Sequence, residues 1–347
     1  MIEFNILTPE AHCLTLKEQL DSLYAQMPQH LLQVRIYLSD AANQWNEVAQ
    51  HPLFSQSISK AAWSCVEQPP IGMKIALQVL YADSLEGFEI SHPADCVTVI
   101  RKEKMLYVFH TVRYSNEEAA RMDDRRQTIE AFEQHKALLS QYGMNVCDNC
   151  HRTWIFVRDI DRHYAGVVQG RNEFFAENGL TSDTHYIAST GIGGDSTERH
   201  PVVAIDFFSV KGLEKDAVKY LHATDYLNPT REYGVAFERG TQLKLPIGKT
   251  SLISGTASID KFGKCIHIGD VLTQAGRLFL NIEKLLEDGN QQLSDMKYMI
   301  VYLRDIADAK SVAQYLDMRF PNVPKLITAA RVCRPEWLIE VECIAIS

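Results

Sequence analysis

The chain has 347 residues, of which 46% are hydrophobic and 23% are charged. This composition excludes a disordered chain, and the length allows two domains with cores of their own. The net charge of −9 is spread without a basic stripe, so we expect no nucleic-acid partner.

The first sixteen residues contain no cationic segment followed by an apolar one, and no apolar run reaches the length of a bilayer span. We therefore expect a cytoplasmic protein without a membrane partner. The eight cysteines then indicate buried thiols and no disulfide framework.

The first 145 residues predict a small α+β unit followed by a helix. Residues 14–27 have helical spacing, and residues 96–102 and 105–112 alternate as strands do. Ser115 and Glu118 then form the pattern of a capping box, which predicts one helix that continues to a stop at Gly143.

The middle of the chain predicts strand, helix, strand and strand in that order. These elements correspond to residues 151–160, 164–179, 184–194 and 200–210. Residues 223–234 are rich in turn formers, which is typical of a linker.

The last third is the most regular part of the pattern. A strand at 250–255 precedes a helix with apolar residues three and four apart from Leu272 to Leu286, which ends at Gly289. A strand, a short helix and two strands follow at 296–306, 309–320, 325–333 and 337–346. Such a sheet buries one face under its helices and leaves the other free to meet another domain or subunit.

Short motifs in this order carry a resemblance to known families. The closing strand "IEVECIAI" resembles that of the RidA/YjgF (endoribonuclease L-PSP) family over about the last hundred residues. Six motifs in order resemble the chorismatases, which remove pyruvate from chorismate and add an N-terminal domain to the same fold. They are "RTWIF" at 152–156, Tyr164 with "GRNEFF" from Gly170, "ASTGIGG" from Ala188, "FERG" at 237–240, "SGTASI" at 254–259 and "CRPEWLIEVE" from Cys333.

The resemblance implies an α+β fold with a RidA/YjgF-like (chorismate mutase-like) β-sheet, helices packed on one face, and two domains of related architecture. We expect an N-terminal α+β region at 1–145, a middle block at 146–232 that completes the N-terminal RidA-like domain, and a C-terminal RidA/YjgF-like domain at 233–347. It also implies a homotrimer, a small carboxylated substrate, no metal and no cofactor. Ile155, Phe156 and Glu238 depart from the chorismatase pattern at positions where substrate is expected.

A protonated carboxylic acid suits the protonation of an enol ether. Glu340 and Glu342 share one face of their strand by the two-residue period, and a desolvated carboxyl beside a like charge has a raised pKa. The resemblance gives the role of general acid to Glu340. The alternative is that both glutamates lie on a solvated edge.

Two substrate carboxylates call for guanidinium groups, which bind them bidentately. Arg239 is the first candidate, and Arg331 and Arg334 are further ones, with surface solubility as the alternative for each. RidA-type deaminases have an arginine fifteen residues before the glutamate, where this chain has Lys325, and a lysine lacks the guanidinium fork.

Cys333 lies seven residues before Glu340, the spacing of the chorismatases that yield 3-hydroxybenzoate, and Gly240 fits their small residue after the arginine. The alternative for Cys333 is a small core residue. The bare string around Ser254, Thr256 and Ser258 predicts a pocket wall with hydroxyl donors, or else a tight turn under the next helix.

Two further patterns are discounted. Cys147, Cys150 and His151 fit the short haem-attachment motif, but haem attachment requires export and zinc requires further ligands. "GIGGDS" lacks the downstream residues of a phosphate loop. Three hypotheses therefore stand: a chorismatase-like lyase or hydrolase, a RidA-like deaminase of enamines or imines, and a non-catalytic protein that binds a small metabolite.

Overall fold

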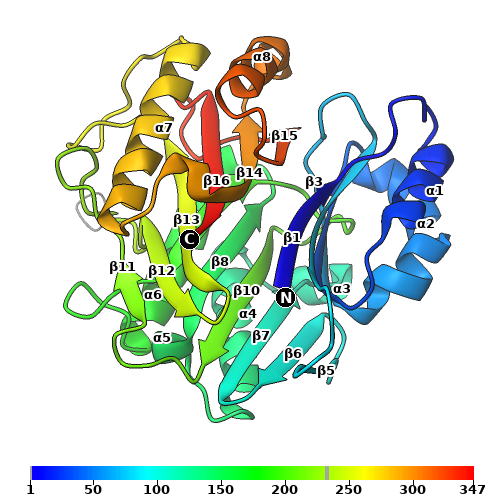
Figure 1. Cartoon of the computed structure of the whole chain (residues 1–347), viewed down its shortest axis with the longest axis horizontal. Helices are drawn as coiled ribbons and strands as arrows, with labels where there is room; N and C mark the ends of the chain where they lie inside the picture. Colours follow the sequence, from blue (N-terminus) through cyan, green and yellow to red (C-terminus); the bar gives the residue numbers. More distant parts are fainter. Residues whose placement is uncertain (1, 231–233) are drawn as a thin grey trace.

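The computed structural model describes residues 2–230 and 234–347, and in that part of the chain the strands form three sheets (Figure 1). The first sheet has the order β1-β4-β2-β3. Its strands are β1 (Ile2–Leu7), β2 (Leu31–Leu38), β3 (Ala62–Glu67) and β4 (Ile75–Ala82), and its helices are α1 (Leu16–Gln26) and α2 (Ala41–Gln50).

The second sheet has the order β5-β6-β7-β10-β8-β9. Its strands are β5 (Glu89–Ser91), β6 (Val97–Lys102), β7 (Met105–Val112), β8 (Cys150–Val157), β9 (Ala188–Gly193) and β10 (Val203–Lys211). Its helices are α3 (Asn116–Ala119), α4 (Asp124–Ser140), α5 (Val146–Asn149) and α6 (Ile160–Glu177).

The third sheet has the order β11-β12-β13-β16-β14-β15. Its strands are β11 (Val218–Tyr220), β12 (Gly240–Leu245), β13 (Gly248–Ala257), β14 (Met296–Leu303), β15 (Lys325–Ala329) and β16 (Ile339–Ile346), and its helices are α7 (Val271–Asp288) and α8 (Ala309–Arg319). Short helical turns lie at Leu53–Ser57, Ile58–Lys60, Leu293–Asp295 and Ile306–Asp308.

The same connectivity occurs three times. In the second and third sheets the last strand of the unit inserts between its third and fourth strands, and a helix connects the one parallel pair, β8 with β9 or β14 with β15. A parallel pair requires such a crossover. The first sheet lacks the two leading strands but keeps the rest of the order, with β2 and β3 parallel. The expected α+β fold with RidA-like sheets is confirmed, and residues 2–82 add a shortened third copy.

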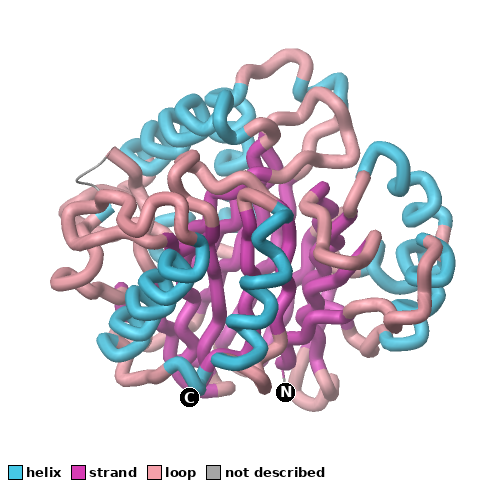
Figure 2. The backbone as a smooth tube through the Cα atoms, turned by 90° about the horizontal axis from the view of Figure 1, so that it is seen from above, coloured by secondary structure: helices cyan, strands magenta, loops and turns pink. Residues whose placement is uncertain are grey.

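The sheet faces without helices pack against one another at the centre of the molecule. Figure 2 shows the strands gathered inside and the helices around them. Tyr37 of the first sheet, Trp154 of the second and Tyr298 of the third belong to one buried core. The free sheet face expected from the sequence therefore meets the other sheets of the same chain.

The helix predicted after Ser115 is in fact two helices. The capping box of Ser115 and Glu118 is present, but it begins only the four-residue α3. Asp123 accepts a hydrogen bond from the backbone N–H of Arg126 and so begins α4. A second cap inside the apolar pattern therefore restarts the helix, and Gly143 follows it at a positive φ of 60°.

Residues from both sides of position 145 form the second sheet, and β11 of the third sheet precedes position 233. The domain boundaries expected after residues 145 and 232 stay predictions. Of the expected linker 223–234, residues 231–233 lie outside the described residues.

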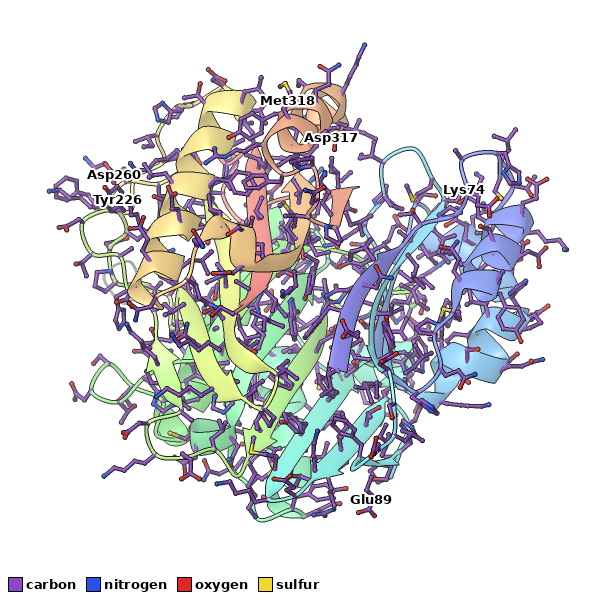
Figure 3. The ribbon with its side chains drawn as sticks, viewed as in Figure 1. Lys74, Glu89, Tyr226, Asp260, Asp317 and Met318 are labelled. Carbon is purple, nitrogen blue, oxygen red and sulfur yellow. The ribbon has the colours of Figure 1, made fainter. Side chains whose placement is uncertain are left out.

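On the outer side of the molecule, Asp317 and Met318 extend from α8 into solvent, and Met318 is 79% exposed (Figure 3).

Candidate active site

A cavity of about 170 Å³ lies between the second and third sheets. Helix α6 and strand β9 form one wall, and β13, β16 and the segment before β16 form the other. The lining residues are Tyr164, Arg171, Ser189, Gly191, Val235, Phe237, Arg239, Gly255, Ala257, Ile259, Cys333, Arg334, Trp337 and Glu340.

Two loops beside this cavity are held together by Arg277 of α7. Its guanidinium donates hydrogen bonds to the carbonyl oxygens of Ile259, at 3.0 Å, and Tyr226, at 3.1 Å. Figure 3 shows Tyr226 and Asp260 at the same edge of the molecule. This half-buried cation thus fixes the spacing of two loops that the sequence places more than thirty residues apart.

Glu340 is the carboxyl group in the cavity. Its strand β16 lies between β13 and β14, where Glu340 pairs with Ala257 and Tyr302, and the residue is 4% exposed. Burial, and then the negative charge of Glu342, raises the pKa of Glu340 to about 8. The group is therefore mostly protonated at neutral pH, which a general acid requires.

Glu342 lies on the same strand face but in a different environment. Its carboxylate accepts hydrogen bonds from Arg152, at 2.8 Å, from the indole N–H of Trp154, at 2.9 Å, and from the hydroxyl of Thr190. These donors stabilise the charged form, and the residue does not line the cavity. The alternative of a solvated edge is wrong for both glutamates, since each is at most 4% exposed.

Gly255 is the small residue that the site requires. A Cβ atom at this position would collide with Oε1 of Glu340, and the Gly255 backbone N–H donates to Thr190 Oγ1 at 2.9 Å. The small residues at 254–258 thus leave room for the carboxyl group of Glu340 and let β13 approach the second sheet closely.

The three hydroxyl groups expected to face substrate bond within the protein instead and do not line the cavity. Ser254 donates to the carbonyl of Glu238 at 2.6 Å and also accepts the backbone N–H of Ser189. Thr256 donates to the carbonyl of Ser254, and Ser258 to that of Ile266.

Among the described residues, three guanidinium groups line the cavity: Arg171, Arg239 and Arg334. Arg171 and Arg239 are only 2% and 8% exposed. Arg334 donates to the carbonyl of Gly263 at 3.1 Å and lies over the ring of Trp337. Such a set suits a ligand with more than one carboxylate. Arg171 was not among the expected site residues, although it belongs to the quoted motif "GRNEFF".

Cys333 also lines the cavity, where it hydrogen-bonds with Tyr164. Burial, and then the charge of Glu340, raises the pKa of the Cys333 thiol to about 12. A neutral thiol is a poor nucleophile, so the raised pKa favours a role for Cys333 in shaping the cavity. Tyr164, like Arg171, comes from α6 and was not predicted as a site residue.

Three expected residues lie elsewhere. Gly240 packs under Leu221 and Ile253 in the core. Arg331 is largely exposed, lies near Asp159 and Asp161, and lines a different cavity of about 450 Å³. Lys325 pairs with Asp317 at 3.0 Å at the start of β15.

The departures from the chorismatase pattern lie outside the cavity, contrary to the expectation from the sequence. Ile155 is buried in the core between the second sheet and its helices. Phe156 packs beneath the guanidinium of Arg35 at 4.9 Å. Glu238 accepts the backbone N–H of Tyr186 at 2.9 Å and lines an adjoining cavity of about 330 Å³.

Within residues 2–230 and 234–347, no three His, Cys, Asp or Glu side chains lie in an arrangement that could hold a metal ion. In the Cys147, Cys150 and His151 motif, Cys150 and His151 are buried. In the same described part, no helix has the length and apolar character of a membrane span.

Comparisons with known proteins agree with this architecture. Residues 238–347 match the family model of endoribonuclease L-PSP. The 3-aminoacrylate deaminase RutC of Acinetobacter baylyi is 27% identical over 99 residues, which cover 27% of this chain and 75% of the relative. A RutC family protein of Pyrococcus abyssi is 29% identical over 103 residues, 29% of this chain and 81% of its own length.

A solved structure matches nearly the whole chain. A crystal structure of a chorismatase superposes with a TM-score of 0.71 and 18% identity, and the match covers 99% of both chains. The C-terminal third of this chain is therefore similar to the L-PSP family, and the chain as a whole has the fold of that chorismatase.

Proposed function

We propose that this protein removes pyruvate from chorismate, as a chorismatase-like lyase or hydrolase. The observation that carries the proposal is a buried Glu340 with a raised pKa, in a cavity lined by Arg171, Arg239 and Arg334, in a chain with the chorismatase fold. Chorismate is a dianion with an enol ether, so it offers two carboxylates to the arginines and one carbon to the acid.

In the proposed reaction, Glu340 transfers its proton to the methylene carbon of the enol ether. The oxocarbenium ion that forms is attacked by water, and the hemiketal then releases pyruvate and a ring alcohol. Water returns a proton to Glu340 and supplies the one that ends on the ring oxygen. If the ring hydroxyl attacks in place of water, its proton returns to Glu340 and a cyclic ketal forms. The bond between the ring and that hydroxyl oxygen then breaks, pyruvate leaves with this oxygen as its keto group, and the hydrogen on the neighbouring ring carbon moves to the oxygen that remains, which gives 3-hydroxybenzoate. The position of Cys333 favours this product over a dihydroxycyclohexadienoate.

A RidA-like deaminase is the second candidate, because the L-PSP match and the deaminase relative cover the C-terminal region. The arginine position of those deaminases is Lys325 here. Lys325 pairs with Asp317 and does not line the cavity that contains Glu340, which weakens this candidate. A protein of this fold that binds a small carboxylated metabolite without catalysis is the third.

The test is to incubate the purified protein with chorismate and to follow pyruvate release, with chromatography of the second product. Glu340→Gln keeps the size of the side chain and removes the acid, so we expect a loss of roughly 100- to 10,000-fold. Glu336→Gln, an exposed glutamate on the segment before β16, is the matched control.

Pyruvate release at the spontaneous rate from the folded parent protein would contradict the proposal. An assay with reactive enamines would then test the deaminase, and binding of chorismate without turnover would favour the third candidate.

A further inference from the structure

We propose that Glu342 is a positioning residue: held as a carboxylate by side chains of the first and second sheets, it keeps the catalytic proton on Glu340. The first sheet, which contributes no lining residue to the cavity, takes part through Arg35. The role assigned to the proton rests on the proposed function, whereas the charge distribution between the two carboxyls does not.

The charge of Glu342 follows from the directions of its hydrogen bonds. The Thr190 hydroxyl accepts from Arg152 at 2.6 Å and from the Gly255 backbone N–H at 2.9 Å. Its single hydrogen is therefore directed at Glu342. Arg152 also donates to Oε2 of Glu342 and Trp154 donates to Oε1, so Glu342 is the acceptor in all three hydrogen bonds. This geometry favours the carboxylate.

Glu340 lies two residues earlier on the same strand face. Within the described part of the chain, none of the donors that hold Glu342 bonds to Glu340. A negative charge on Glu340 would be buried close to the one on Glu342, and two neighbouring buried carboxyl groups do not both ionise readily. The proton is thereby assigned to Glu340, the carboxyl in the cavity.

Arg35 connects the first sheet to this pair. It lies on β2, is 2% exposed, and its Nη1 is 3.8 Å from Oε1 of Glu342. Two further nitrogens of its guanidinium donate to Oδ2 of Asp206, at 2.6 and 3.0 Å, and Ser64 donates to the same oxygen. Asp206 thus fixes the guanidinium next to Glu342.

The network makes definite predictions about the titration of Glu340. The groups that act on Glu340 are Glu342, Arg152, Arg239 and Cys333, and the cavity also contains Arg171 and Arg334. Around Glu342 lie Arg35, Arg152 and the phenols of Tyr37, Tyr298 and Tyr302. Removal of the negative charge of Glu342 should make Glu340 a stronger acid. Removal of the positive charge of Arg35 should do the opposite, because Glu342 is then less compensated.

The experiment is an infrared titration of the folded, full-length protein without substrate, in which the protonated carboxyl band of Glu340 is assigned by its loss in Glu340→Gln. We expect Glu342→Gln to move the midpoint to lower pH by about one unit or more. We expect Arg35→Gln to move it to higher pH and Arg35→Lys to restore the parent value. Glu336→Gln should leave it unchanged.

The pH profile of pyruvate release supplies the second measurement. In Glu342→Gln, activity should begin to fall at a lower pH than in the parent, with kcat reduced more than KM is raised. Opposite shifts in the two variants support the inference, whereas shifts in one direction or no shift would overturn it. If Arg35→Gln fails to fold, Glu342→Gln alone decides, since glutamine keeps its shape.

The two proposals fail separately. A shifted infrared midpoint in a protein that releases no pyruvate would leave the assignment of the proton standing and remove the proposed function. Pyruvate release with an unchanged midpoint in Glu342→Gln would support the proposed function and overturn the role of Glu342.

Discussion

Glu340 and Glu342 are two residues apart on one strand, yet their surroundings differ. Glu342 receives three donors, and Glu340 faces a cavity in which burial raises its pKa to about 8. The pattern of alternating residues predicts their common face but not this difference, because the donors come from β8 and β9, between 152 and 190 residues earlier.

The raised pKa of Glu340 has a consequence for stability. Between the ordinary pKa of 4.5 and about 8 the folded protein retains a proton that the unfolded chain has lost, so the free energy of unfolding falls as pH rises through this range. Glu340→Gln removes this pH-dependent loss of stability. We expect it to be more stable than the parent at pH 9, by a few kcal/mol at most, and much less so at pH 5.

Thermal unfolding of both proteins across this pH range checks the expectation. A stability difference that is the same at pH 5 and pH 9 would contradict a raised pKa in the folded state.

Gly255 offers a second test at the residue scale. In Gly255→Ala the new methyl group must displace the Glu340 carboxyl, so we expect pyruvate release to fall by about 100-fold or more. Gly276→Ala is the control, since its Cβ would meet nothing closer than Tyr315 at 4.0 Å and alanine favours the helix. Equal activity in both variants would show that Gly255 does not define the site.

Part of the site could be predicted from sequence because the C-terminal motifs place Glu340, Cys333, Arg239 and Arg334 close together. Tyr164 and Arg171 were missed as site residues because α6 belongs to another sheet, and only folding brings that helix to the cavity. The hydroxyls of Ser254, Thr256 and Ser258 were misassigned, because a sequence does not show that neighbouring backbone groups already use them.

At the scale of elements, α6 depends on its close contact with α4. A Cβ atom at Gly170 would meet the carbonyl oxygen of Arg125, so the two helices pack through this glycine. Gly170→Ala should cost about 2 kcal/mol or more of unfolding free energy, because backbone cannot move aside as a side chain does. Denaturant unfolding measures this loss, and a neutral result would contradict the contact.

Elements with strong local signals were predictable, and those without were not. Most predicted strands and α7 agree with the structure to within a few residues, since apolar periodicity and caps act locally. The break between α3 and α4 was missed because nothing in the sequence around Asp123 distinguishes it from a residue inside the helix, whereas in the structure it caps the start of α4. The short strand β11 and the strand β12 carry too little apolar alternation to be recognised.

At the scale of the whole molecule, three sheets with one connectivity enclose a common core. The sequence indicates two related domains but not the third copy, because residues 2–82 lack the two leading strands and share no evident motif with the rest. Sheet order depends on pairings between distant strands, which a sequence pattern does not encode.

The homotrimer implied by the resemblance is testable against this architecture. Because the three sheets already cover each other's free faces, we expect a monomer of 39.4 kDa in solution. Light scattering coupled to size exclusion measures the mass, and a species of three times that mass at micromolar concentration would show that a further surface assembles.

Arg35 also shows what it means that the three sheets belong to one chain. Its guanidinium meets Gln78, Asp206 and Glu342, which lie on β4, β10 and β16, the strands that hold the same place in their sheets. Identical subunits around a threefold axis must repeat each residue three times, so one acid there would become a ring of three like charges. A single polypeptide is free of that repetition: around Arg35 it can place one amide and two different acids on the equivalent strands of its three sheets, and it can give each seam between the sheets its own side chains.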